Sequence, residues 1–115
     1  MTTHEIRTAA EQMIGKTVRS FDFANGPADD PYGRDLEGER ACYIVGTVVG
    51  ILKADDFASD GKTTFHDCDR YILKADHRIF RGEIEIAKVK NQEFFPPLNG
   101  TNAIHNEISM VEEVV

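Results

Sequence analysis

The sequence predicts a mostly β domain of the α+β class, a small twisted antiparallel sheet or barrel of four to six strands with one N-terminal amphipathic helix. Apolar residues recur at helical spacing most clearly near the N-terminus, and beyond Gly15 β-branched and aromatic runs alternate with polar connections. The 115 residues, 41% hydrophobic and 29% charged, suit a single domain spanning residues 1–115, with its β core over residues 16–115.

The predicted helix spans residues 3–14. Thr2 and Glu5 have the spacing of a capping box, in which each side chain accepts a hydrogen bond from the other residue's backbone amide. Gly15 is a common stop signal. The residues that recur at helical spacing are Ile6, Ala9, Ala10, Met13 and Ile14. We expect this apolar stripe to lie on the sheet or on a partner subunit.

Five segments have the composition of strands. Residues 16–23 are rich in β-branched and aromatic side chains, and residues 41–52 are apolar on both faces, which favours a central buried strand. Residues 69–75 alternate apolar and polar positions, and residues 83–89 alternate acid and isoleucine before a change of phase typical of a bulge. The tail over 104–115 fits either a helix or a strand, and we favour a strand.

The segments between these strands are predicted to be loops. Residues 24–40 and 53–66 are polar and are expected to be exposed, the second with a turn at Asp60–Gly61. Residues 94–101 contain two prolines, which lack amide donors and fix an extended backbone. A rigid loop is therefore expected there.

The charge and the apolar content argue against two classes of partner. Twenty acidic residues against 13 basic ones give a net charge of −7, which repels phosphate backbones and argues against nucleic acid as a partner. No apolar run approaches the roughly 20 residues of a membrane helix, and the N-terminus lacks the apolar core of a signal peptide. We expect a cytoplasmic protein without a membrane association, whose two cysteines are reduced.

Patterns for catalysis and metal binding are weak. The sequence contains neither a Walker-type phosphate loop nor GxGxxG. Cys68 with His66 or His77 suggests a thiol with a base, or part of a zinc site, but lacks the spacing of either. The acidic residues of segment 24–40 lack the ligand alternation of a calcium loop. The sequence predicts neither an enzyme nor a bound metal ion or cofactor.

One group of residue types suits recognition of a nucleotide-like ligand. Aromatic rings can stack on a base, an amide side chain can bond to the edge of the base, and arginines can hold phosphates through paired hydrogen bonds. The candidate ligand-binding residues are Arg19, Phe21, Arg78, Arg81, Phe94, Phe95 and Asn99. Two alternatives stay open for the phenylalanines at 94 and 95, which either face a ligand or close one end of the core.

Four segments together resemble a group of small hypothetical proteins from bacteriophages and prophages. They are IGKTVRSFDF at 14–23, CYIVGTVVGI at 42–51, RYIL at 70–73 and FPPLNGT at 95–101. The resemblance covers most of the chain, and FPPLNGT is its most specific part. Phage genes of this size often act against host defence, and one class encodes oligomeric sponge proteins that bind cyclic ADP-ribose variants or cyclic oligonucleotides without cleaving them.

The resemblance implies a noncatalytic anti-defence accessory protein located in the host cytoplasm. We expect it to be a homo-oligomer, because many apolar strand positions with only one short covering helix leave a sheet face or edge to bury against a second copy. Together with the candidate residues, it leads us to expect that the protein sequesters a small nucleotide-derived signalling molecule between subunits. One alternative is a protein-binding inhibitor of a host defence enzyme, with the acidic segment on a basic surface of that enzyme. Another is a small-barrel adaptor within a phage complex.

Overall fold

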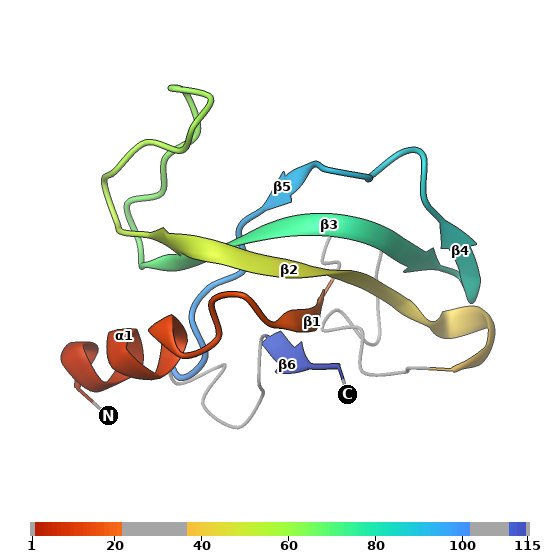
Figure 1. The fold of residues 1–115 in the computed structure, drawn as a ribbon, viewed down its shortest axis with the longest axis horizontal. Coiled ribbons are helices and arrows are strands. Elements are labelled where there is room, and N and C mark those ends of the chain that lie inside the picture. The colour runs from red at the N-terminus through yellow and green to blue at the C-terminus, as the bar shows by residue number, and fades with distance from the viewer. Residues whose placement is uncertain (1, 22–36, 102–110, 115) are drawn as a thin grey trace.

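The computed structural model describes residues 2–21, 37–101 and 111–114. They form one α-helix, α1 (Thr3–Glu11), a 3-10 helix, η1 (Gly38–Arg40), and six strands (Figure 1). The strands are β1 (Thr17–Phe21), β2 (Cys42–Leu52), β3 (Arg70–Phe80), β4 (Glu83–Glu85), β5 (Glu93–Phe94) and β6 (Val111–Glu113). The predicted small α+β sheet with a single N-terminal helix is confirmed.

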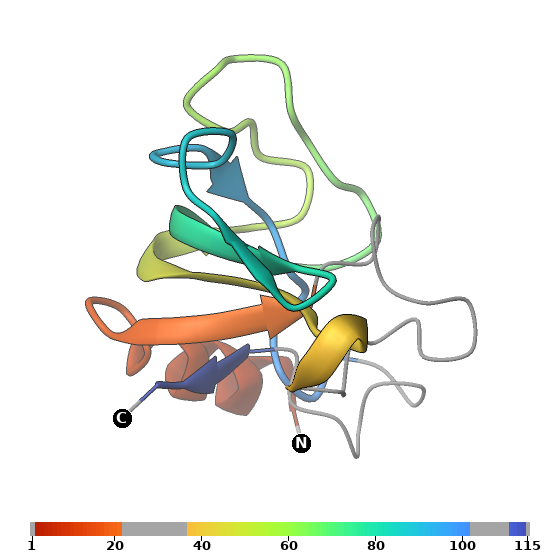
Figure 2. The same cartoon turned by 90° about the vertical axis from the view of Figure 1, so that its right-hand side faces the viewer.

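The sheet is antiparallel and, in the described part of the chain, open. Its strands follow the order β4-β3-β2-β1-β6, and β5 pairs with β3. The long strands β2 and β3, each of 11 residues, form the central hairpin, and the short strands β4 and β5 share the outer edge of β3 (Figures 1 and 2). The sequence was compatible with either a sheet or a closed barrel, and the described residues form a sheet.

Two irregularities bend the central hairpin. The register of β2 against β3 shifts between Val45 and Gly46 and again between Val48 and Gly50. Extra residues of this kind increase the local twist of a strand pair. The predicted strands over 41–52 and 69–75 are therefore present, but their pairing is interrupted twice.

The core lies between α1, the sheet and the segment that follows β5. Ala10 of α1 is 2% exposed, and Ile6 and Met13 pack against the same core. The apolar stripe of the helix therefore lies on the sheet of its own chain. The buried core residues are Ala10, Val18, Ile44, Val48, Tyr71, Leu73, Ala75, Val89, Leu98 and Val111.

The capping box predicted at the start of the helix is present, with the Glu5 amide donating to the Thr2 hydroxyl and the Thr2 amide to the Glu5 carboxylate. The helix ends at Glu11, three residues earlier than expected. The amides of Met13 and Ile14 bond three residues back, which makes a tight turn in place of a further helical turn. The predicted helix end at residue 14 is therefore wrong, because residues 12–14 form this turn and not a continuation of the helix.

Two strand boundaries also differ from the prediction. The strand expected over 69–75 continues to Phe80, because its second half pairs with the start of β2 on one side and with β4 on the other. The strand expected over 83–89 ends at Glu85, because the Ile86 carbonyl accepts the amides of Val89 and Lys90 and closes a turn. This turn buries Val89 in the core.

The predicted loops have definite positions where the structure describes them. The acidic segment 24–40 lies outside the described residues except for residues 37–40, which include η1. The loop over 53–66 is mostly exposed and turns at Asp60–Gly61. Segment 94–101 is a loop apart from Phe94 in β5 and a bridge between Pro97 and Arg70. Within the described ranges, no helix has the length and apolar character needed to cross a membrane.

Candidate functional site

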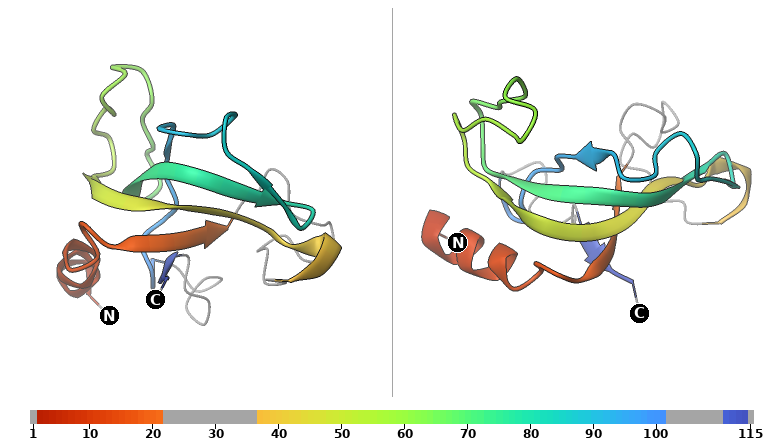
Figure 3. Two further views of the ribbon diagram at one scale, coloured as in Figure 1. Left: turned by 45° about the vertical axis from the view of Figure 1, so that its right-hand side comes forward. Right: turned by 45° about the horizontal axis from the view of Figure 1, so that its top comes forward.

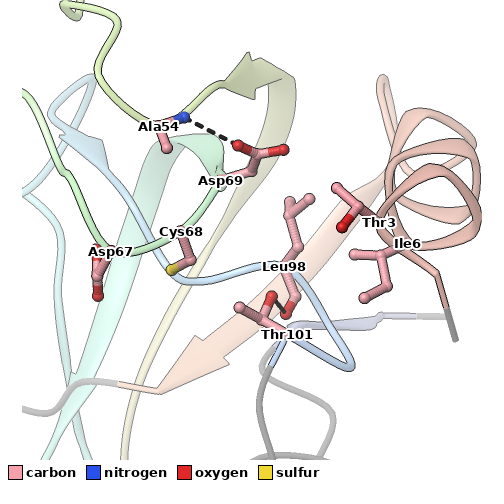
Figure 4. Close-up of a pocket in the computed structure, with 8 residues that line it drawn as sticks. All are labelled: Thr3, Ile6, Ala54, Asp67, Cys68, Asp69, Leu98 and Thr101. Carbon is pink, nitrogen blue, oxygen red and sulfur yellow. Dashed lines mark hydrogen bonds between the residues drawn. The ribbon is translucent and has the colours of Figure 1, made fainter.

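A cavity of about 280 Å³ lies where α1, the segment leading into β3 and residues 98–101 meet (Figure 4). Its wall combines apolar side chains, hydroxyls, carboxylates and a thiol. The lining residues are Thr3, Ile6, Ala54, Asp67, Cys68, Asp69, Leu98 and Thr101. Such a mixture of apolar surface and a few convergent polar groups is typical of small-molecule sites.

Asp69 joins α1 and Ala54 to the segment that leads into β3. Its Oδ2 accepts a hydrogen bond from Arg7 Nε of α1 at 2.5 Å. Its Oδ1 accepts one from the Ala54 amide at 2.9 Å, which Figure 4 draws as a dashed line. The side chain of Asp69 is only 10% exposed. The hydrogen bond from Arg7 lowers the pKa of Asp69 in spite of the opposing effect of burial, so the carboxylate is ionised at neutral pH.

Cys68 lines the cavity together with Leu98 and Thr101 (Figure 4). Burial raises the pKa of the thiol, and the neighbouring Asp67 carboxylate raises it further. A thiol with a raised pKa is protonated at neutral pH and is a poor nucleophile.

The two histidines considered as bases for Cys68 bond elsewhere. Nδ1 of His66 lies 2.6 Å from an Asp55 carboxylate oxygen, and Nδ1 of His77 lies 2.8 Å from an Asp76 carboxylate oxygen. The cavity therefore holds a protonated thiol without a histidine hydrogen-bonded to it in the described structure.

A cluster of Phe65, Arg70 and Phe95 is joined to the cavity wall through Asp67. The guanidinium carbon of Arg70 lies 4.1 Å from the centre of the Phe65 ring, and the rings of Phe65 and Phe95 are 5.7 Å apart. Arg70 also donates to the Phe95 carbonyl at 3.0 Å and to the Asp67 carboxylate at 3.0 Å. This cluster fixes Asp67, which lines the cavity, against segment 94–101.

The structure places the candidate rings Phe94 and Phe95 in packing positions. Phe94, in β5, lies opposite Leu73 of β3 and packs against the core. Phe95 is half-buried against Phe65. Neither ring lines the cavity.

The side chain of Asn99 forms hydrogen bonds with the backbone of β6. Its side-chain Nδ2 donates to the Val111 carbonyl, and its Oδ1 accepts the Val111 amide, both at 2.9 Å. The amide side chain thus acts as a short strand that pairs with the start of β6. The edge-reading group expected from the sequence is engaged within the fold.

Arg19 and Phe21 lie on β1, away from the cavity lining. Arg19 donates to the Glu112 carboxylate of β6, with the closer nitrogen at 2.9 Å. Phe21 pairs in register with Tyr43 of β2, and its side chain lies outside the described residues.

Arg78 lies at the far end of β3 from Phe94 and Phe95, and Arg81 directly follows that strand. Arg78 is 3.7 Å from the Glu85 carboxylate, and the Arg81 guanidinium lies 5.3 Å from the centre of the Phe80 ring. Phe94 pairs with Leu73, and Arg78 is five positions further along β3 than Leu73, about 16 Å at the usual rise of a strand. The structure therefore does not bring these arginines and Phe94 into one pocket.

The cavity was not predicted from the sequence. Arg7 and Asp69 are 62 residues apart, so no local spacing links them. The local sequence indicates for the run His66-Asp67-Cys68-Asp69 only part of a zinc site or a thiol with a base. Over residues 2–21, 37–101 and 111–114, no three or more His, Cys, Asp or Glu side chains gather as metal ligands would.

Comparison with known proteins adds no relative to these observations: no family model, no curated protein and no solved structure matches the chain significantly.

Proposed function

We propose that this protein is a noncatalytic accessory protein of the phage type, which binds and sequesters a small nucleotide-derived signalling molecule. The observation that carries the proposal is the cavity between α1, residues 67–69 and residues 98–101, with a volume of about 280 Å³. Ligand pockets for drug-sized molecules typically begin near 300 Å³, so a cavity of this size suits one nucleoside unit of a larger signal.

The lining suits the base and the ribose better than the phosphates. Ile6 and Leu98 offer apolar surface to the face of a base. The hydroxyls of Thr3 and Thr101 and the carboxylate of Asp67 can accept hydrogen bonds from amino groups and ribose hydroxyls. Carboxylates repel phosphates, so the phosphate part of a ligand would lie outside the cavity.

A cationic group lies next to the wall of the cavity. The side chain of Arg7 is 40% exposed and donates through Nε to Asp69, a lining residue. A guanidinium is the protein group best suited to phosphate oxygens, because its planar donors match their geometry. The phosphate group of a bound ligand that extends out of the cavity toward α1 would therefore contact Arg7.

The chemistry of the wall supports binding without catalysis. The raised pKa of Cys68 leaves its thiol protonated at neutral pH, and both histidines considered as its base bond to aspartates elsewhere. A ligand held here would be released unchanged, as sequestration requires.

Titration calorimetry with AMP, cyclic ADP-ribose and a cyclic dinucleotide tests the proposal. We expect at least one of them to bind and to be recovered unchanged by chromatography. Thr3→Val removes a hydroxyl from the cavity wall and should weaken binding by roughly fivefold to tenfold, the value of about one hydrogen bond. The matched control is Thr8→Val on the same helix, where the hydroxyl bonds only the His4 carbonyl.

Two results would contradict the proposal. One is the absence of binding heat with all three nucleotides, and the other is equal weakening by Thr8→Val and Thr3→Val. Conversion of the nucleotide during incubation would contradict its noncatalytic part.

A further inference from the structure

We propose that the connection between β2 and β3 is a protein-docking loop, in which Phe57 inserts into an apolar pocket of a partner protein with a basic rim. This docking loop, residues 53–69, stands out from the sheet in every view of the ribbon (Figures 1, 2 and 3). The proposal rests on the exposure of Phe57, on the internal order of the loop and on its charge. The docking loop includes four residues of the cavity wall, Ala54, Asp67, Cys68 and Asp69, but Phe57 does not line the cavity, so substitutions at position 57 test this proposal separately from nucleotide binding.

Phe57 is unusually exposed for a phenylalanine. Its exposed fraction is 62%, whereas the other phenylalanine side chains that the structure describes, at positions 65, 80, 94 and 95, are half-buried. Large aromatic side chains gain the most free energy when a partner removes them from water, and they are frequent anchors of protein interfaces. An exposed ring at the side of a projecting loop has the position of such an anchor.

The docking loop is ordered by its own hydrogen bonds. Phe57 forms a bridge with Thr64, and the Ala58 amide donates to the Thr63 carbonyl at 2.8 Å. At the tip, the Asp60 carboxylate accepts the amides of Lys62 and Thr63, both at 2.8 Å. These bonds, led by the one from the Thr63 hydroxyl, lower the pKa of Asp60 to about 2.

The base of the docking loop is also fixed. The Ala54 amide donates to Asp69 at 2.9 Å, the Asp55 amide donates to the Phe65 carbonyl at 2.8 Å, and Ala58 is only 8% exposed. A loop that is already ordered loses little conformational entropy on binding, which favours affinity. The backbone around Phe57 is therefore already ordered before a partner binds.

The charge of the docking loop selects the chemistry of the partner. The exposed charges of the loop's projecting part are Asp55, Asp56 and Asp60 against Lys53 and Lys62, and Glu93 of β5 joins them by accepting the Ser59 hydroxyl at 2.9 Å. Asp67 and Asp69, at the base of the loop, are paired with Arg70 and Arg7, and the whole chain has a net charge of −7. Complementary charge at the rim of a binding site steers association and excludes wrong partners. The loop therefore fits a basic protein surface, and it would repel both nucleic acid and the equally acidic loop of a second copy.

The test places a photo-crosslinking amino acid at position 57 of the full chain in bacterial cells. We expect an adduct with one protein, identified by mass spectrometry, whose crosslinked peptide contains apolar residues flanked by lysine or arginine. With that protein purified, Phe57→Ser should weaken binding on the order of tenfold or more. The affinity of the parent should fall as salt is raised.

The matched control is Ile14→Ser, which removes another exposed apolar side chain, at 45% exposure, outside the docking loop. It should leave the affinity unchanged, and both variants should melt like the parent because exposed substitutions rarely alter stability. The proposal is overturned if no adduct forms, if the chain crosslinks only to itself or to nucleic acid, or if Ile14→Ser weakens binding as much as Phe57→Ser. Each of these outcomes leaves nucleotide binding by the cavity unaffected, so the two proposals fail separately.

Discussion

At Gly46, β2 passes so close to β3 that a side chain has no room. A Cβ atom built there would lie 2.9 Å from the Ala75 Cα and closer still to the Lys74 carbonyl oxygen, both of them backbone atoms. We therefore expect Gly46→Ala to reduce the free energy of unfolding by about 1 to 3 kcal/mol, the usual cost of overpacking. Urea denaturation measures this directly.

Gly50, at the second register shift of β2, is the matched control. A Cβ atom there would meet only the Ile72 Cδ1 at 3.5 Å, an ordinary contact. Gly50→Ala should therefore unfold close to the parent. Equal losses of unfolding free energy at both positions would show that the strand propensities of glycine and alanine, and not the close approach at Gly46, determine the effect.

Asn99 should stabilise the edge of the sheet through its two hydrogen bonds to Val111. Asn99→Ala removes both bonds and leaves a buried backbone amide and carbonyl unsatisfied, so we expect a loss of about 1 to 3 kcal/mol. Hydrogen exchange at the Val111 amide should accelerate. Gln92→Ala is the control, since the side chain of Gln92 is exposed and bonds only the Lys88 carbonyl. An unchanged exchange rate at Val111 would contradict this role of Asn99.

The candidate residues show what a sequence can and cannot reveal at this scale. Residue type indicated that Asn99 would make directional hydrogen bonds and that Phe94 would be apolar surface or a stacking group. It could not reveal their partners, because Val111 is 12 residues from Asn99 and Leu73 is 21 residues from Phe94. Long-range pairing decided both outcomes.

Among the elements, α1 is held to the start of β3 by the bond from Arg7 to Asp69. The pKa of Asp69 is lower in the folded state than in the unfolded chain, so this contact stabilises the fold above the unfolded pKa of about 3.9. The stabilisation is lost as the pH falls through the folded pKa. We expect the melting temperature to fall as the pH drops below about 4, and to fall less steeply in Asp69→Asn.

Asp56→Asn is the control for this titration, because it removes an exposed carboxylate from the same loop. It should keep the acid dependence of the parent. The pKa values of Asp60, Asp67 and Asp76 are also lowered, so part of the acid dependence should remain in Asp69→Asn. Identical melting curves for Asp69→Asn and the parent at every pH would show that the contact contributes nothing.

The elements themselves were predictable wherever local chemistry defines them. The capping box correctly gave the start of α1, and the apolar run correctly gave β2. The ends of elements were less predictable, because they depend on pairing. Residues 76–80 carry polar side chains such as Asp76 and Arg78, yet they remain in β3 because β2 and β4 pair with them on both sides.

For the whole molecule, the open sheet leaves exposed apolar residues at one edge. Ile84 of β4 is 66% exposed and Ile86, just beyond it, is 54% exposed. Exposed strand edges with apolar side chains favour pairing with another chain. We expect sedimentation to show a dimer in the parent and a monomer in Ile84→Lys. Val49→Lys, on β2 and away from both edges, should leave the dimer intact.

A monomer at high concentration would contradict this expectation, and so would equal dissociation by both lysine variants. Open and closed sheets could not be distinguished in advance, because the same alternating pattern serves both and closure depends on how the outermost strands meet. The cavity could not be foreseen for a related reason, since its wall is drawn from three segments distant in the sequence.

The unequal burial of the two cysteines makes the unaltered chain suitable for spectroscopy. Cys42 is 1% exposed within β2, whereas Cys68 is partly accessible in the cavity wall. A small trifluoromethyl thiol reagent should therefore modify Cys68 first, and more rapidly at alkaline pH because the pKa of its thiol is raised. The fluorine resonance of that single tag would then report whether the cavity is empty or filled, without any engineered position.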